Sequence, residues 1–178
     1  MEYQTSTMAR TKDSAIKWFI WPLVVAAAIL SVKPAHAEQL SLIVNGKALH
    51  LNAPADRNYN EKNWGGGLQF DFDKTENNWV PFVTASGFKD SNNNPSYYAG
   101  GGALKRFEFG NSGYHVDVGG VAFVMTRKGF RNDDPFLGAL PVVSLGTERI
   151  ALNITYVPKM DPKWVPLFFL QLKIGLYP

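Results

Sequence analysis

The sequence predicts an all-β fold, an eight-stranded antiparallel transmembrane β-barrel of the outer membrane. Three observations predict it. A leader-like segment precedes the rest of the chain, runs of roughly ten residues with two-residue alternation recur between polar turns, and cysteine is absent. Because strands of ~9 to 11 residues cross a bilayer at a tilt of ~45°, runs of this length fit a membrane barrel.

Residues 1 to 37 are expected to form a secretory signal peptide, and residues 38 to 178 the barrel domain. Arg10, Lys12 and Lys17 precede an apolar stretch, and Ala35-His36-Ala37 supplies the small residues of a cleavage site. The apolar stretch of roughly 15 residues is shorter than the ~20 that a membrane-spanning helix needs. This difference favours a cleaved leader over a retained anchor.

The charge of the expected mature chain is nearly balanced. The leader holds four basic and two acidic residues, which leaves 14 basic and 13 acidic residues and a net charge of +1. The sequence therefore does not support a nucleic-acid partner. Without cysteine, an exported domain is stabilised by means other than disulfides, and a closed sheet embedded in lipid is one such means.

The first four expected strands lie between residues 39 and 108. Leu68-Gln69-Phe70-Asp71-Phe72-Asp73 places apolar side chains on one face and polar ones on the other. Asn92-Asn93-Asn94-Pro95 is typical of a turn. The stretch from Ser96 to Leu104 holds too many glycines for a helix, where each costs ~1 kcal/mol against alanine. The expected ranges are 39–51, 63–73, 77–88 and 96–108.

The last four expected strands are predicted from the same alternation. Tyr114-His115-Val116-Asp117-Val118 and Arg149 to Tyr156 each divide into an apolar and a polar face. A soluble sandwich also alternates. The final strand favours a membrane barrel, since it has aromatics near both ends and an apolar middle, as interfacial girdles require. The expected ranges are 113–126, 138–147, 148–157 and 164–177.

Eight strands predict a narrow lumen and a defined placement of loops. The interior has room for packed side chains or one slender ligand, which excludes a general diffusion porin. If the first strand rises from the periplasm, the longer connections lie outside the cell, as such barrels prefer. These connections are 52–62, 89–95, 127–137 and 158–163.

Three residues at the expected outer rim form a candidate catalytic set. His50 ends the first strand, and alternation turns its ring away from the face that Leu49 and Leu51 use. Asp90 and Ser91 open a loop on the same side. An imidazole base, a carboxylate that orients it and a hydroxyl are the groups that activate an oxygen nucleophile. A merely polar rim is the alternative interpretation of the same residues.

Other polar features favour structural roles. His115, beside Asp117, is expected to be a lumen or interfacial residue near a periplasmic turn. The glycine triplets at 65–67 and 100–102 lack the Lys-Ser/Thr of a phosphate loop, so we interpret them as close backbone approach, a bend or room for a ligand. A metal site is not expected, because no cysteine or clustered histidine is available.

Several blocks in one order resemble the lipid A palmitoyltransferases (PagP) of Gram-negative outer membranes over about residues 48 to 178. Phe88-Lys89-Asp90-Ser91 is similar to the family's catalytic loop. The family has an amphipathic helix before its first strand, whereas the expected mature chain begins almost directly at one. The remaining blocks are Tyr59 to Gly67, Ala99 to Gly102, Pro135 to Gly146 and Asn153 to Pro158.

The resemblance implies transfer of a palmitoyl chain from a glycerophospholipid to lipid A, without cofactor or metal. The catalytic roles would fall on His50, Asp90 and Ser91, and the pocket floor that sets chain length on Gly102. Pro141 and Pro158 would loosen strand pairing and admit lipid sideways.

The resemblance also implies the setting of the protein, a monomer in the cell outer membrane with a glycerophospholipid donor and a lipid A acceptor as partners. The alternative is a non-enzymatic barrel in adhesion, lipid binding or envelope stability. A lipid A deacylase that uses the same rim is a third possibility.

Overall fold

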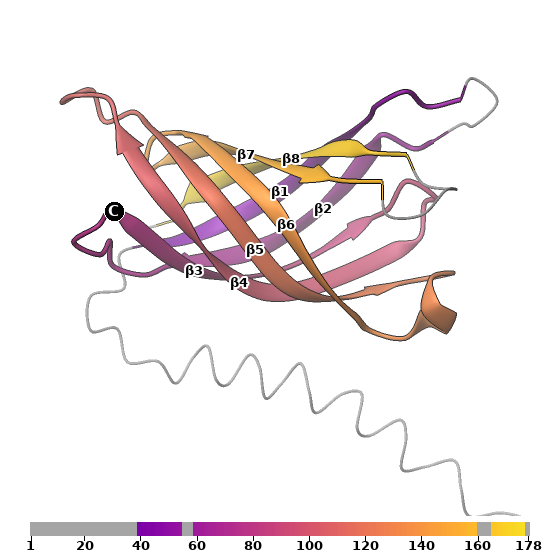
Figure 1. Cartoon of the computed structure of the whole chain (residues 1–178). Coiled ribbons are helices and arrows are strands. Elements are labelled where there is room, and N and C mark those ends of the chain that lie inside the picture. Colours follow the sequence, from indigo (N-terminus) through magenta and orange to yellow (C-terminus); the bar gives the residue numbers. More distant parts are fainter. Residues whose placement is uncertain (1–38, 55–58, 160–164, 177–178) are drawn as a thin grey trace, which may run out of the picture. The chain divides into compact units, whose positions relative to one another are not determined.

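A computed structural model describes residues 39–54, 59–159 and 165–176, and these form a closed antiparallel barrel (Figure 1). Each strand pairs with its neighbour in sequence, and β1 pairs with β8 to close the sheet. The predicted eight-stranded barrel is therefore confirmed, while the expected leader lies outside the described residues. The strands are β1 (Gln39–His50), β2 (Lys62–Asp71), β3 (Trp79–Lys89), β4 (Pro95–Glu108), β5 (His115–Arg127), β6 (Phe136–Gly146), β7 (Ile150–Val157) and β8 (Leu167–Gly175).

The connections divide between two ends of the barrel. Those after β1, β3, β5 and β7 lie at the right of Figure 1, which we call the long-loop end, and one of them carries the short 3-10 turn η1 (Arg131–Asp133). Short connections at 72–78, 109–114 and 147–149 lie at the left, the short-turn end. Three of the connections at the long-loop end are longer than any at the short-turn end, as predicted, whereas the connection after β3, residues 90–94, is shorter than the one at 72–78.

The two faces of the sheet differ in polarity, because most buried side chains in the lumen are polar and the exterior is apolar. Asn45 and Gln69 are buried, whereas their apolar strand neighbours Leu42 and Leu68 are exposed. Exposed aromatics stand near both ends of this apolar exterior, as in the girdles of a transmembrane barrel. They are Trp64, Tyr97 and Tyr156 toward the long-loop end and Trp79, Phe107 and Tyr114 toward the short-turn end. None of the described helices is long and apolar enough to span a membrane.

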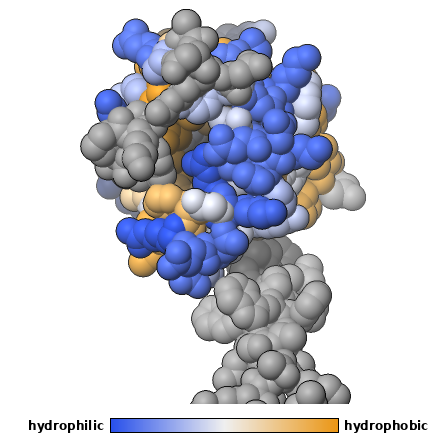
Figure 2. All heavy atoms as spheres, turned by 90° about the vertical axis from the view of Figure 1, so that its right-hand side faces the viewer, coloured by the Kyte–Doolittle hydropathy of each residue, from blue (hydrophilic) through white to orange (hydrophobic). Residues whose placement is uncertain are grey.

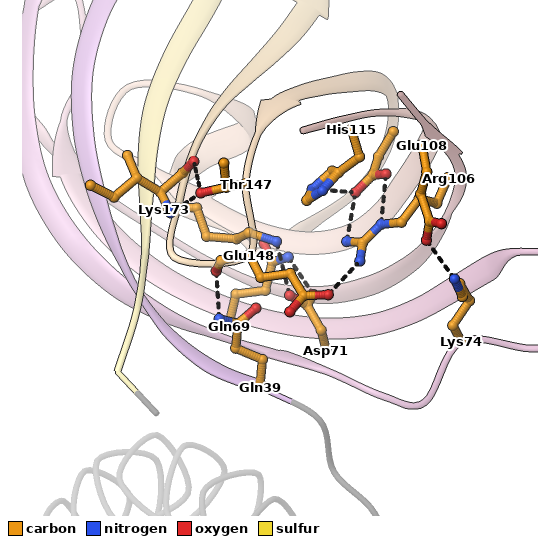
Figure 3. A network of polar contacts seen from close by, with 12 residues as sticks. Gln39, Gln69, Asp71, Lys74, Arg106, Glu108, His115, Thr147, Glu148 and Lys173 are labelled. Carbon is orange, nitrogen blue, oxygen red and sulfur yellow. Dashed lines mark hydrogen bonds and ion pairs between the residues drawn. The ribbon is translucent and has the colours of Figure 1, made fainter. Parts of the chain in front are cut away.

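Charged side chains occupy the lumen at the short-turn end (Figure 3). Lys173 Nζ donates to Asp71 Oδ2 over 2.9 Å, and Arg106 makes a bidentate pair with Asp117 over 3.0 and 3.1 Å. His115 is buried beside Asp117, 3.5 Å from its Oδ2. The predicted lumen position of His115 is confirmed, and the carboxylates here are neutralised by cations from other strands.

Candidate active site at the long-loop end

A cavity of about 400 Å³ lies in the barrel and reaches its long-loop end. His50, Asp90 and Ser91 all line it, so the three predicted rim residues share one cavity. Figure 2 looks onto this end, where hydrophilic residues cover most of the face and hydrophobic residues appear at the flanks and between the loops. A cavity of this size is typical of a small-molecule site.

His50 is the last residue of β1, and its imidazole is held by an aromatic neighbour. The ring stacks on that of Tyr59 with centroids 4.4 Å apart and an interplanar angle of 11°. Its buried Nδ1 has no hydrogen-bond partner among the described residues. The stacking fixes the plane of the imidazole, and the unpaired nitrogen leaves it with unused hydrogen-bonding capacity.

Asp90 follows β3 directly and organises the asparagine-rich turn. Its Oδ1 accepts hydrogen bonds from the backbone N–H groups of Asn92 and Asn94 at 2.8 and 2.9 Å. This is the local side-chain-to-backbone bonding that aspartate favours in turns, and Asn93 takes the left-handed conformation with φ of 63°. The sequence-predicted turn is thereby explained by Asp90 as much as by its asparagines.

The second oxygen of Asp90 is held from another strand. Arg127 Nε donates to Asp90 Oδ2 over 2.8 Å, and Asp90 is only 3% exposed. Both carboxylate oxygens therefore have partners other than His50. The predicted role of Asp90 in orienting His50 stays a prediction. In this structure the carboxylate instead bonds to the backbone of its own loop and to Arg127.

Ser91 is half-buried in the loop after β3, and this loop is tied to the one after β1. The backbone oxygen of Ser91 accepts from Asn60 N over 2.9 Å, and Asn60 Nδ2 donates to Asn93 Oδ1 over 2.9 Å. The loop that carries Tyr59 and the loop that carries Ser91 are thus joined. Ser91 lines the same cavity as His50, whose imidazole stacks on Tyr59.

Sequence reasoning missed Tyr59 and Arg127 as members of this site. Arg127 ends β5 and lies two residues from Met125, which also lines the cavity. Strand alternation, extended to the ends of all the strands, could have placed Arg127 at this rim. Tyr59 lies in a loop, where no periodicity predicts which neighbour a side chain contacts.

The deep part of the cavity is apolar on one side. Phe82, Leu104 and Val142 form a buried cluster with Val121 packed against it, and all four line the cavity. Gly102 is not among the lining residues. A Cβ at Gly102 would clash with the carbonyl oxygen of Gly120 and lie 2.9 Å from Phe82 Cζ. Gly102 therefore permits close approach of β4 to β5, and the Phe82 ring lies between it and the cavity.

The cavity also reaches the outside of the barrel along β6. The register between β6 and β7 runs only from Val142 opposite Thr155 to Gly146 opposite Ala151. Between this paired segment and the long-loop end, Leu137 of β6 lines the cavity although it is 82% exposed. Pro141 stands at the upper limit of the paired segment, and Pro158 follows the end of β7. Both prolines lack the N–H that would extend the ladder.

Within the residues that the structure describes, no group of three or more His, Cys, Asp or Glu side chains is arranged to hold a metal ion. The site is built from an imidazole, a carboxylate paired with a guanidinium, and a hydroxyl. These groups can perform proton transfer and nucleophilic chemistry on an ester without a metal.

The fold is a small closed barrel with an apolar exterior, of the kind found in membranes. Its lumen holds a cavity at the long-loop end, where an imidazole, a carboxylate and a hydroxyl residue line the mouth. These are the groups that an acyl-transfer site uses. A family model described as "Antimicrobial peptide resistance and lipid A acylation protein PagP" matches residues 35–171. The chain belongs to this family.

Curated relatives support the same assignment. The chain is 32% identical over 102 residues to the lipid A acyltransferase PagP of Bordetella pertussis, a match that covers 57% of this chain and 55% of the relative. It is 32% identical over 101 residues to the lipid A palmitoyltransferase PagP of Escherichia coli, with 56% and 53% covered. The matches thus span about half the length of these relatives.

Two solved barrels were found by comparison of structures. Neisserial surface protein A aligns with a TM-score of 0.45 and 17% identity, covering 76% of this chain and 93% of its own. The outer membrane protein Ail of Yersinia pestis aligns with a TM-score of 0.39 and 13% identity, covering 78% and 100%.

Proposed function

We propose that this protein is an outer-membrane acyltransferase that moves a palmitoyl chain from a glycerophospholipid to lipid A. The barrel acts as a monomer, with the long-loop end at the cell surface and residues 1 to 37 removed as a signal peptide. The apolar exterior and its aromatic girdles support the membrane placement. Membership of the lipid A acylation family supports the substrates.

The observation that carries this proposal is one cavity that joins the rim residues to the apolar interior. The donor's ester lies at the mouth beside His50 and Ser91, and its acyl chain extends toward Phe82 and Leu104. An active site of this kind binds the part of the substrate that does not react, and this binding positions the part that does.

The chemistry assigned to the rim is acyl transfer between oxygen atoms. His50 acts as the general base and Ser91 as the nucleophile or as a hydroxyl that positions the ester. The acyl C–O bond of the phospholipid breaks, the acyl group passes to lipid A, and the lysophospholipid leaves with a proton. Asp90 is assigned to hold the loop of Ser91, and to orient the imidazole when the contact with Arg127 opens.

The test is a transfer assay with the folded full-length barrel, labelled palmitoyl phosphatidylcholine and lipid A. Labelled lipid A with release of lysophospholipid supports the proposal. Free labelled palmitate without acylated lipid A means that the protein is a hydrolase. Unchanged substrates mean that the barrel is non-enzymatic, an outcome for which the pairing of Asp90 with Arg127 rather than His50 would be the structural reason.

If lipid enters the cavity sideways between β6 and β7, Pro141 and Pro158 should affect the rate of acyl transfer. We expect Pro141→Ala with Pro158→Ala to slow transfer severalfold in vesicles, because residues with an N–H can extend the ladder between β6 and β7 and narrow the side opening. The measurement is the initial rate of transfer from phospholipid vesicles. Pro81→Ala in β3 is the matched control, since this strand lies away from the opening. Unchanged turnover in the double variant would remove the idea of sideways access.

The structure places Phe82, and not Gly102, among the residues that line the deep part of the cavity. Phe82 is therefore the first residue to change in a test of acyl-chain selection. We expect Phe82→Ala to shift the preferred donor toward longer chains, because each additional buried methylene contributes ~0.8 kcal/mol, about fourfold in affinity. Gly102→Met stays the predicted change that shortens the chain, and it would act by displacing Phe82 and Gly120.

The measurement is competition among donors of graded chain length, with the exposed Phe107→Ala as the control. A chain profile that neither Phe82→Ala nor Gly102→Met alters would show that the floor lies elsewhere.

A further inference from the structure

The two sides of the cavity are chemically unlike. The apolar cluster of Phe82, Leu104 and Val142 comes from β3, β4 and β6. Toward the mouth β7 and β8 contribute the apolar Val157, Leu167 and Phe169, but the deeper lining residues from β7, β8 and β2 are polar. An unsubstituted hydrocarbon chain offers these polar residues no hydrogen bond. The polar side of the cavity, which we define by these residues, consists of Gln69, Asn153, Thr155 and Gln171.

Most of the amide groups on the polar side are already satisfied. Gln171 Nε2 donates to Asn45 Oδ1 over 2.6 Å and to Tyr98 OH over 2.9 Å. Gln69 Nε2 donates to Asp71 Oδ1 over 2.7 Å. These bonds fix both glutamines in place, so they form a rigid wall rather than an adaptable one.

Asn153 differs from its neighbours on this wall. It is 5% exposed and lines the cavity, and its Oδ1 has no hydrogen-bond partner among the described residues. Buried side-chain oxygens are normally paired, and one that is left unpaired costs free energy. The Oδ1 atom is itself buried, and a rotation of the amide would turn this unpaired acceptor toward the cavity, where a ligand hydroxyl can donate.

The position of Asn153 in the strand sets how deep that hydroxyl lies. Asn153 is four residues below Val157, the end of β7 and itself a lining residue. At ~3.3 Å per residue this is ~13 Å along the strand, and a tilt of ~45° leaves ~9 Å below the rim. The hydroxyl is therefore in the middle of the chain and not beside the ester.

We propose that the cavity selects acyl chains that carry a hydroxyl near the middle of the chain, which donates to Asn153 Oδ1. This rests on the proposed function for the way the chain enters, ester at the mouth and tail inward. A site built to hydrogen-bond a hydroxyl disfavours the analogue that lacks it, because its own buried group is then unpaired. The apolar cluster receives the unsubstituted flank of the same chain.

The test is direct binding of free fatty acids to the folded full-length barrel in one detergent, by displacement of a fluorescent fatty acid. We expect 9-hydroxystearate to bind about tenfold more tightly than stearate, the factor that ~1.4 kcal/mol gives, and 3-hydroxystearate to show no such gain. Asn153→Leu, similar in size but apolar, is expected to abolish the preference. Equal binding of the three acids to the unaltered protein overturns the proposal, since water then satisfies Asn153.

A matched control variant at the mouth of the cavity tests whether the hydroxyl preference depends on Asn153 in particular. Asn63 also lines the cavity, and its buried Oδ1 has no partner within residues 39–54, 59–159 and 165–176, but it is the second residue of β2 and lies at the rim. Asn63→Leu is expected to keep the ratio between 9-hydroxystearate and stearate. A ratio that falls equally in both variants contradicts the assignment to Asn153.

The unaltered protein and the two variants are also measured in the transfer assay, so that a failure of this inference can be distinguished from a failure of the proposed function. A binding preference without any transfer supports the polar side of the cavity and removes the acyltransferase. Transfer from stearoyl and 9-hydroxystearoyl donors at equal efficiency supports the acyltransferase and removes the inference.

Discussion

We expect His50→Ala and Ser91→Ala each to lower palmitoyl transfer to lipid A by at least ~10²-fold, the scale of a lost general base. Both side chains line the cavity where it reaches the long-loop end. Without the imidazole the attacking oxygen keeps its proton, and without the hydroxyl the ester loses its nucleophile or its positioning group. The measurement is the initial rate with labelled phosphatidylcholine and lipid A.

Neither change should unfold the barrel. His50 and Ser91 lie at the ends of strands or in a loop, and the ladder that closes the sheet does not depend on their side chains. Retained folding is checked by the change in gel mobility on heating. Ser112→Ala, which removes a hydroxyl from the turn at the opposite end, is the matched control and should leave the rate unchanged. Full transfer by both rim variants would overturn the assigned roles.

The architecture of the barrel was largely readable from two-residue alternation. Leu68 to Asp73 predicted unlike faces, and the structure buries Gln69 and Asp71 while it exposes Leu68. A slip of one residue in strand register would move every side chain to the opposite face of the sheet. Because lumen and exterior differ in polarity, such a slip is unfavourable and the register is well specified. The number of strands and the end at which His50, Asp90 and Ser91 gather follow from this constraint.

The partners within the site were not readable in the same way. Alternation and topology bring Asp90 to the rim, but the choice between His50 and Arg127 as its partner depends on distances of a few ångströms. Arg127 is 37 residues away in sequence and meets Asp90 only after β3, β4 and β5 have paired. A bidentate-capable guanidinium is also the stronger partner for a carboxylate.

Glycine shows why the floor of the cavity was hard to predict. In the sequence, Gly102 belongs to a glycine triplet that is consistent with close backbone approach, a bend or room for a ligand, and the family resemblance implies that it is the floor of the acyl pocket. In the structure the space beside Gly102 is taken by the backbone of Gly120 and by Phe82. A sequence records which side chain is missing, but the identity of the group that fills the gap depends on the neighbouring strand.

The largest effect on stability is expected from Lys173→Met. Lys173 Nζ donates to Asp71 Oδ2 over 2.9 Å, and the two side chains are 3% and 7% exposed. Methionine preserves most of the volume but leaves the Asp71 carboxylate buried without its cation. Breaking a buried pair in this way costs ~3–5 kcal/mol. The measurement is the free energy of unfolding from urea titrations of the folded barrel in micelles.

Two further variants identify the cause of this loss. Lys47→Met breaks an exposed pair with Glu61, whose atoms are 3.5 Å apart, and should cost no more than ~1 kcal/mol. Asp71→Leu combined with Lys173→Met removes both charges and should recover most of the stability, since apolar replacement of a buried pair is often nearly neutral.

The double variant distinguishes a buried charge from a lost packing contact. If Lys173→Met is destabilising because a lone carboxylate is buried, removing that carboxylate must relieve it, and the coupling between the two positions is then large. A double variant as unstable as Lys173→Met alone would mean that the lysine stem, and not its charge, stabilises the lumen. The Lys173–Asp71 charge pair would then be dispensable for closing the barrel beneath the cavity.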